Sequence, residues 1–415
     1  MRRERRGLFF GFVFGSAFVF TGVVIWIPAQ RQLVCTSSSQ CATLQSSSSQ
    51  TDRISMAGKT GHKTVDLRMN GEMEALKQRM FFDQMMADMA KENSSTLPPP
   101  PSKNNPNQKF LIFTCRSSDG ISGGWGDRQK GMVNAFLLAT VTNRRFGIVF
   151  NEPCDLRQFY VPNEYNWDVP ELQNKSWKYV RSIDGMTPFR NDLYHMDFNE
   201  EYPQDVIFLH TNNEHYKAIT LNPHYNLTLP VWAQKPLSLF FHDAWNMLFK
   251  PTRELQNRVD SFLHKIHFFN RTKPLVGFHV RIGKSSEMND FSVRNHKEKL
   301  GPVWDFVGRY VKNGSQVFLA TDNNDIRNTS RVRFGPAHHD TEGVILHIDT
   351  QKRRKDACQG FNDLIVEQLM LTHCDILVKS RSGFSRRAVM MRGGLQEIFV
   401  FRDADIRPES LLTVT

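Results

Sequence analysis

The apolar positions of this chain form one long run near its start and, from residue 110 onward, short runs separated by polar loops. The short runs that predict buried strands are residues 110–115, 145–150, 275–280, 316–320, 343–348, 375–378 and 397–401. Apolar positions at helical spacing lie between several of them, at residues 132–141, 303–311, 363–372 and 386–392. Strands that alternate with helices indicate an α/β fold with parallel sheets. Residues 151–265 show no such rhythm.

The long run, residues 8–27, carries no charged side chain and is long enough to cross the apolar core of a membrane. Four arginines lie in the short segment before it, residues 1–7, so the positive-inside rule leaves that tail in the cytosol and the rest of the chain in the lumen. A cleaved signal peptide is the alternative, but its apolar region would normally be shorter and followed by small residues. We therefore expect a retained type II anchor.

Residues 28–108 are rich in Ser, Thr, Gln, Asn and Pro, a composition typical of a flexible stem. Within it, residues 72–91 lack Gly and Pro and place apolar side chains at mostly three- and four-residue steps. This pattern predicts a short amphipathic helix that self-associates, giving a homodimer, or packs on the folded region. A helix that stands alone in the stem is an equally good interpretation, because only about three heptads are present.

Sequons and cysteines agree with a lumenal location. The N-x-S/T sequons predict glycosylation at Asn93, Asn174, Asn226, Asn270, Asn313 and Asn328. Cys35 and Cys41 lie in the stem. The other four cysteines allow three pairings, which the sequence cannot rank: Cys115, Cys154, Cys358 and Cys374.

A glycine-rich turn, residues 120–128, follows the first predicted strand. It is not a dinucleotide fingerprint, because a third glycine would be needed at Gln129, and no P-loop Gly-Lys-Ser/Thr follows. Its backbone N–H groups and the next helix N-terminus suit an anion or a sugar hydroxyl. The simpler interpretation is a tight turn.

Chemically useful side chains recur just past the predicted strands. Arg281 follows the strand that contains His279, Asp322 follows the strand that ends at Ala320, and Ser382 lies in the turn after Val378. The carboxyl ends of parallel strands share one edge, so these groups should converge on one crevice. The planar fork of Arg281 suits bidentate contact with phosphate, which indicates a phosphate-bearing donor substrate. The plainer interpretation is an arginine in a surface ion pair.

The net charge of +11 would permit a nucleic-acid partner. The basic residues are mostly dispersed among acidic ones and no nucleic-acid-binding motif is present, so we expect none. Four tryptophans suit a carbohydrate-facing surface, because aromatic faces pack on sugar rings, although core packing is the better interpretation for most: Trp167, Trp177, Trp232 and Trp245.

Together, the motifs are similar to those of a known family. The H-V-R-I-G loop at 279–283, the A-T-D turn at 320–322 and the S-x-S-x-F-S turn at 380–385 resemble the three peptide motifs of the fucosyltransferase superfamily, which joins α1,2-, α1,6- and protein O-fucosyltransferases. The Gly-Gly-Trp-Gly-Asp-Arg turn with its following helix looks most like the N-terminal motif of plant-type and rhizobial fucosyltransferases. The likeness spans about residues 110–401, although 151–265 contribute little.

This resemblance implies a GT-B architecture, with two Rossmann-like domains facing a cleft. Residues 109–265 would form the acceptor-side domain, and residues 266–415 would bind GDP-fucose. The expected activity is inverting transfer of L-fucose from GDP-fucose to a glycan or glycoprotein, at the Golgi or ER membrane, without a cofactor or metal.

The resemblance also implies roles for individual residues. Arg281 would hold the β-phosphate and be catalytic, His279 would contact the nucleotide, and Glu367 would bond the guanine edge. The other expected donor-site residues are Gly283, Asp322, Ser382, Phe384 and Ser385. The residues expected to close the cleft from the other domain are Gly124, Gly126, Asp127 and Arg128. The candidates for a general base are Asp127 and Glu152.

Two departures limit the assignment. The α1,6 enzymes carry H-V-R-R-x-D, whereas this chain has Ile282 and Lys284 at the last two specified positions, which puts α1,6 core activity in doubt. Glu367 is one methylene longer than the aspartate usual there. Two other functions stay open: a catalytically silent lumenal lectin or scaffold with the same fold, and a transferase that uses another nucleotide sugar.

Overall fold

The computed structural model describes residues 107–414, except for 171, 173, 184–186, 285–286, 289, 291 and 395. Residues 1–106 lie outside this range, and with them the predicted tail, anchor, stem helix, and the stem up to residue 106. Within the described ranges, each helix is too short or too polar to span a bilayer.

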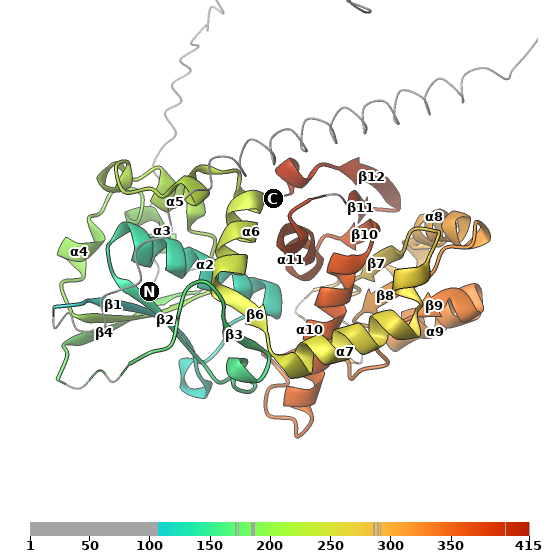
Figure 1. Cartoon of the computed structure of the whole chain (residues 1–415), viewed down its shortest axis with the longest axis horizontal. Coiled ribbons are helices and arrows are strands. Elements are labelled where there is room, and N and C mark those ends of the chain that lie inside the picture. Colours follow the sequence, from blue (N-terminus) through green and yellow to red (C-terminus); the bar gives the residue numbers. More distant parts are fainter. Residues whose placement is uncertain are drawn as a thin grey trace, which may run out of the picture. The chain divides into compact units, whose positions relative to one another are not determined.

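Two separate sheets organise the described chain, and they are here called the N-terminal and the C-terminal sheet (Figure 1). The N-terminal sheet is parallel and runs in the order β2-β1-β5-β4. Its strands are β1 (Phe110–Cys115), β2 (Arg145–Phe150), β4 (Trp177–Ser182) and β5 (Val206–Thr211). A small antiparallel pair lies beside it, formed by β3 (Tyr160–Pro162) and β6 (Phe249–Pro251).

The C-terminal sheet runs in the order β12-β11-β10-β7-β8-β9, and its strands are parallel except for the β11–β12 hairpin. Its strands are β7 (Val276–Val280), β8 (Val317–Thr321), β9 (His338–His339), β10 (Ile376–Ser380), β11 (Glu397–Arg402) and β12 (Asp405–Glu409). The three central strands are fully buried and apolar for most of their length, as a parallel sheet covered on both faces requires.

We call residues 107–265 the first half and residues 266–414 the second half. The helices of the first half are α2 (Trp125–Val141), α3 (Thr187–Asp192), α4 (Phe198–Glu201), α5 (Tyr216–Thr220), α6 (Leu237–Leu248) and α7 (Arg253–Lys265). Those of the second half are α8 (Gly301–Lys312), α9 (Asn324–Phe334), α10 (Ala357–His373) and α11 (Gly383–Arg392). Short 3-10 turns occur at Ser117–Asp119, Leu156–Gln158, Pro223–Tyr225, Val231–Gln234, Phe268–Asn270, Lys297–Lys299, Gly335–Ala337 and Leu411–Thr413.

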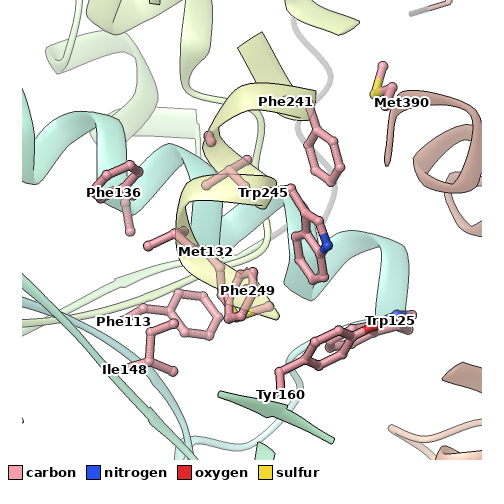
Figure 2. Packing of buried hydrophobic residues seen from close by; sticks show 14 of the residues in the cluster. Phe113, Trp125, Met132, Phe136, Ile148, Tyr160, Phe241, Trp245, Phe249 and Met390 are labelled. Carbon is pink, nitrogen blue, oxygen red and sulfur yellow. The ribbon is translucent and has the colours of Figure 1, made fainter. Parts of the chain in front are cut away.

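Helix α2 joins the two halves. Its middle packs on the N-terminal sheet through Met132 and Phe136, whereas its start reaches the second half through Trp125 (Figure 2). The Trp125 ring meets Phe361 of α10 edge-on at 5.1 Å, and its Nε1 donates to Gln368 at 2.7 Å. Gln129 and Gln368 exchange two amide hydrogen bonds of 2.9 Å, both buried. Buried polar pairs of this kind fix the register of the packed helices as well as their distance.

The first turn of α2 was predicted as loop, and the structure corrects this. The helix begins at Trp125, after the extended Gly124, instead of at residue 132. The turn contains glycine, arginine and glutamine because it packs against α11 and α10 and needs close approach and hydrogen bonds there. Arg128 and Gln129 are nevertheless fully buried. A helix that packs in a polar interface lacks the apolar stripe on which the prediction depended.

The strand predicted at residues 343–348 is also wrong: this segment has no regular structure. Its backbone N–H groups donate to side chains instead of to a neighbouring strand. The N–H of Val344 donates to Asp363 at 3.2 Å, and that of His347 donates to Gln351 at 2.7 Å. Leu346 lies against Gly360 of α10, where any side chain would clash. The apolar side chains of this segment therefore pack on α10 and line a cavity.

One disulfide links the two halves, between Cys154 and Cys358. Cys115 and Cys374 are buried free thiols. Cys35 and Cys41 lie outside the described residues.

Candidate active site

A cavity of about 740 Å³ lies at the carboxyl edge of the C-terminal sheet. One wall comes from the ends of β7, β8 and β10, and the facing wall comes from the glycine-rich loop at the start of α2. The segment 344–349 adds a third wall. This volume lies within the range that holds nucleotide-sized ligands. Most of the predicted site residues line this cavity.

Arg281 enters the cavity directly after β7. Its guanidinium contacts Asp290 at 2.9 Å and Asp322 at 3.3 Å, and about 20% of the side chain is exposed. Both carboxylates are almost completely buried. Arginine has five N–H donors, so these two partners orient the fork and leave donors for a ligand. A diphosphate at this place would share the guanidinium with the carboxylates.

Asp322 organises the loop after β7. Its carboxylate accepts from the N–H groups of Ile282 and Gly283, each at 2.7 Å. Burial raises the pKa of Asp322, and the nearby Arg281 opposes that rise. Gly283 has a φ of +89°, and a side chain there would meet the carbonyl oxygen of Ser292. Gly283 therefore shapes the loop, while it does not itself line the cavity.

Helix α11 begins at the cavity. Ser382 caps it by accepting from the N–H of Phe384, and the cap, Gly383 and Phe384 all line the cavity. Exposed N–H groups and the helix dipole make such an N-terminus favourable for an anion. Arg381, exposed and immediately before the cap, also lines the cavity. The site thus combines a helix N-terminus with cations from two neighbouring strand ends.

His279 lies beneath this helix start. Its Nδ1 is 2.9 Å from the Ser385 hydroxyl, and its ring lies 5.2 Å from that of Phe384. Burial, helped by Arg281, lowers the pKa of His279 to about 3. The imidazole is therefore neutral at physiological pH. Ser385 is fully buried and supports His279 without lining the cavity.

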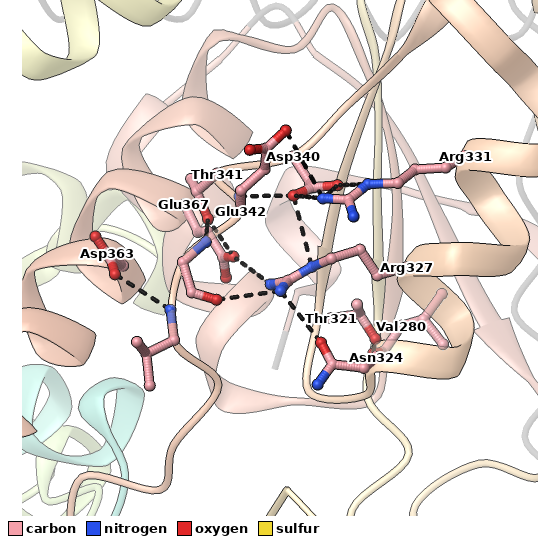
Figure 3. Close-up of polar contacts among 12 residues, drawn as sticks. Val280, Thr321, Asn324, Arg327, Arg331, Asp340, Thr341, Glu342, Asp363 and Glu367 are labelled. Carbon is pink, nitrogen blue, oxygen red and sulfur yellow. Dashed lines mark hydrogen bonds and ion pairs between the residues drawn. The ribbon is translucent and has the colours of Figure 1, made fainter. Parts of the chain in front are cut away.

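Glu367 forms the far end of the cavity, within a polar network of groups on α9, on α10 and in the segment after β9 (Figure 3). Its carboxylate accepts from the Thr341 hydroxyl at 2.7 Å and lies 3.7 Å from Arg327. Arg327 also contacts Asp340, which pairs with Arg331. Burial raises the pKa of Glu367 to about 7, although Thr341 and Arg327 oppose the rise. The Glu367 carboxyl group therefore changes between its protonated and ionised forms near physiological pH.

The wall from α2 approaches α11 very closely at Gly126. A side chain on Gly126 would lie 2.6 Å from the carbonyl carbon of Gly383, so only glycine fits. Gly124, two residues earlier, has open space beside it. Asp127 lines the cavity, is about 40% exposed and pairs with Lys130 at 3.1 Å.

Two predicted residues of this wall lie outside the cavity lining. Arg128 is completely buried, donates to the carbonyl of Gly123 at 2.9 Å and lies 3.5 Å from Asp349. It supports the loop from behind. Glu152 is also buried, and its carbonyl accepts from Arg128. Because its carboxylate does not line the cavity, Glu152 is poorly placed to take a proton from an acceptor there.

Sequence and structure comparisons add a likeness of fold. No protein-family model matches the sequence, and no curated protein matches it. Several solved structures resemble it.

A mutant of Arabidopsis thaliana FUT1 in complex with GDP has a TM-score of 0.49 at 13% identity, over 78% of this chain and 76% of that one. The fucosyltransferase NodZ from Bradyrhizobium gives 0.43 at 15% identity, over 73% and 98%. POFUT1 in complex with GDP gives 0.39 at 13% identity, over 72% and 99%. These values are too low to carry an argument about activity.

The sequence did not single out several cavity residues that the structure brings together. Arg386 lines the cavity, and its buried Nε has no hydrogen-bond partner among the described residues. His347 comes from the segment 343–348 that was predicted as a strand, and Asp349 directly follows that segment. Arg381 lies inside the motif at 380–385, so its position beside Ser382 was a usable signal. For Asp349 there was none, because its partner Ser122 is 227 positions away.

Among the described residues, no group of three His, Cys, Asp or Glu side chains is arranged to hold a metal ion.

Proposed function

We propose that this protein transfers L-fucose from GDP-fucose to a glycan or glycoprotein acceptor, with inversion and without a metal ion. One observation carries the proposal: the motif residues Arg281 and Ser382, with Arg381, face one cavity at the N-terminus of α11, and Glu367 closes its far end. Cations and a helix start suit the diphosphate, and a carboxylate suits the N–H edge of guanine.

The proposed chemistry needs stabilisation of the leaving group above all. As the bond from the anomeric carbon to GDP lengthens, the sugar gains oxocarbenium character and negative charge grows on the β-phosphate. Arg281 is held in place before reaction by Asp290 and Asp322, so it can stabilise this charge without reorganising. Arg381 and the first N–H groups of α11 act on the same diphosphate.

An acceptor hydroxyl would enter from the side of α2. Asp127 is the acidic residue of that wall that was predicted as a base, and its exposed carboxylate lines the cavity. We assign to it the removal of the acceptor proton as the new glycosidic bond forms. Attack from this wall, opposite the diphosphate, gives inversion at the anomeric carbon.

We propose the Golgi or ER lumen as the location, with residues 8–27 as a type II anchor. The described sequon asparagines support this location, because all five are exposed. They are Asn174, Asn226, Asn270, Asn313 and Asn328.

Thermal stabilisation of the full-length protein tests the donor without knowledge of the acceptor. A ligand that binds only the folded state raises stability by RT ln(1 + [L]/Kd). We expect GDP and GDP-fucose each to raise the Tm, and each rise to be the same with and without EDTA. UDP sugars should leave the Tm unchanged. Arg281→Lys should reduce the rise, while Arg354→Lys, at an exposed arginine that pairs with Asp356 outside the cavity lining, should not. A protein indifferent to all guanine nucleotides would refute the donor assignment and favour a lectin or scaffold.

A further inference from the structure

One of the four tryptophans has no place in a core. Trp167, Trp232 and Trp245 are at most 6% exposed, whereas Trp177 is 66% exposed. An exposed indole normally marks a contact surface, because its large apolar face gains much from being covered. Trp177 is the first residue of β4, which is an edge strand of the N-terminal sheet.

The neighbours of Trp177 extend this surface along the strand. Side chains alternate across a strand, so Trp177, Tyr179 and Arg181 share one face of β4. The parallel register places Phe208 of β5 beside Tyr179, and the Phe208 ring meets that of Trp177 edge-on at 6.2 Å. The guanidinium of Arg116 lies 5.7 Å from the Phe208 ring and 6.0 Å from the Tyr179 ring. We call these five residues the Trp177 stripe.

Among the residues that the structure describes, no helix covers this face of the sheet, whereas parallel sheets are usually covered by helices on both faces. The helices α2, α3 and α5 lie on the opposite side of the N-terminal sheet in Figure 1, and connecting chain lies on this side. Val180 of β4 belongs to the same buried cluster as Met132 and Phe136 of α2, whereas Tyr179 and Phe208 are only partly buried.

The stripe is continuous with the candidate active site. Arg181, at its far end, lines the cavity. Tyr179 is tied to the same place by hydrogen bonds: its hydroxyl is 3.0 Å from His210 Nδ1, and His210 Nε2 is 3.0 Å from the Ser122 hydroxyl. The Ser122 N–H in turn donates to Asp349, a cavity residue. The aromatic surface and the wall of the cavity therefore form one connected structure.

We propose that the Trp177 stripe binds an oligosaccharide acceptor, which lies along β4 with its reacting sugar in the cavity. This rests on the proposed function and adds the acceptor class: a glycan of several sugars, in preference to a single sugar. Trp177 lies four residues from Arg181, or about 13 Å along a strand, so only sugars remote from the reacting one reach it. The apolar ring face packs on the indole, and Arg116 and Arg181 supply N–H donors for hydroxyl groups.

Two other occupants make different predictions. The predicted glycosylation site Asn174 lies three residues before Trp177 and is exposed, so the chain's own glycan is one alternative. A peptide that adds a strand to the edge of β4 is the other, and it would be held by backbone hydrogen bonds more than by the indole. Continuity with the cavity through Arg181 favours the acceptor.

The test uses the full-length protein on an array of oligosaccharides, from single sugars to octasaccharides, with GDP present. The variants are Trp177→Ala, Trp177→Phe and, as a matched control, Phe269→Ala, which removes an aromatic ring that is 60% exposed elsewhere. We expect Trp177→Ala to weaken binding of the longer glycans roughly tenfold, equivalent to about 1.4 kcal/mol, and to leave the shortest unchanged. Trp177→Phe should recover part of the loss, and Phe269→Ala should match the wild type.

Three outcomes would overturn the proposal. The first is unchanged glycan binding by Trp177→Ala, and the second is no glycan bound by the wild type. The third is an equal loss of stability in Trp177→Ala, in Asn174→Gln and in the double variant, which would assign the indole to the chain's own glycan. GDP-induced stabilisation of each variant is measured separately. If GDP fails to stabilise the wild type while Trp177→Ala still loses glycans, the stripe stands and the proposed transferase activity falls.

Discussion

The two walls of the cavity differ in the chemistry they present. The wall from the C-terminal sheet carries charge at strand ends, with Arg281, Asp322 and Arg381 following three adjacent parallel strands. The wall from the first half presents backbone at Gly124 and Gly126, and continues outward into the Trp177 stripe.

The difference teaches how one site can serve two unlike substrates. A diphosphate is recognised by a few charged donors that must be held in place, and here two buried carboxylates hold Arg281. A sugar chain is neutral and offers flat apolar faces, so it needs extended aromatic surface instead. Loss of a charged donor from the first wall should therefore slow turnover strongly, and damage to the second should change the choice and affinity of acceptors.

The sharpest test of the charged wall is Arg281→Lys. Lysine keeps the charge but cannot serve Asp290, Asp322 and a phosphate with one planar fork, so kcat/KM for transfer should fall by about 10²–10³. Alanine is a poorer choice, because it leaves two buried carboxylates without their cation and endangers folding. Steady-state kinetics with Arg354→Lys as the control measures the effect. Wild-type kcat/KM in Arg281→Lys would remove Arg281 from the chemistry.

The contact between the walls can be tested with two neighbouring glycines. In Gly126→Ala the new methyl group meets the backbone of Gly383 and Phe384, so it displaces the start of α11. We expect a loss of about 1–3 kcal/mol in the free energy of unfolding, together with weaker GDP binding. Gly124→Ala meets nothing within 4 Å and should change little. Denaturant unfolding of both variants measures the two changes in the free energy of unfolding. Equal effects would mean that the close approach is unimportant.

The same contrast explains how far the sequence could predict the structure. In the second half, short apolar strands with polar residues at their ends are a local signal, and β7, β8, β10 and β11 follow it closely. In the first half, β1 and β2 follow it as well, whereas β4 reads Trp-Lys-Tyr-Val-Arg-Ser with only Val180 and Ser182 buried, so the usual apolar run is absent. The apolar run Val206–Leu209 in β5 is a local strand signal within residues 151–265, although these residues show no strand–helix rhythm as a whole.

Site residues follow the same rule. Arg281, Asp322 and Ser382 lie beside the strands that position them, so local pattern was enough to bring them to one edge. Asp349 depends on a contact with the distant Ser122, which local pattern does not encode. Arg386 directly follows the motif at 380–385, so its place near the cavity was a usable signal. The segment 343–348 has the composition of a strand, yet its apolar side chains cover α10 and line the cavity.

Glu367 predicts a pH dependence confined to the charged wall. Its pKa of about 7 in the folded protein exceeds its ordinary value, so the folded state binds more protons than the unfolded state between those two values. Stability should therefore fall as the pH rises toward and through 7, and GDP affinity should rise as the carboxylate forms. Glu367→Gln should remove both trends and be the more stable protein above pH 7, by a few degrees in Tm. Melting curves with and without GDP, from pH 5 to pH 9, measure both. Parallel pH profiles in the two proteins would exclude Glu367 as the titrating group.

The smallest expected effect concerns the carboxylate that shares Arg281 with the ligand. Asp290 lies 2.9 Å from the guanidinium, and its negative charge opposes a diphosphate at the same place. Asp290→Asn keeps an oxygen that accepts from Arg281 but removes the charge, so GDP should bind about threefold to tenfold more tightly, a gain on the order of 1 kcal/mol.

Asp322→Asn is the informative counterpart. That carboxylate also accepts from two backbone N–H groups, so its loss should loosen the loop after β7 and weaken GDP binding. Calorimetric titration with GDP at two salt concentrations compares the two variants with Asp305→Asn, an exposed aspartate outside the cavity. Weaker GDP binding by Asp290→Asn would show that the main effect of this carboxylate is to position Arg281. Both aspartates would then support the charged wall, and neither would compete with the donor.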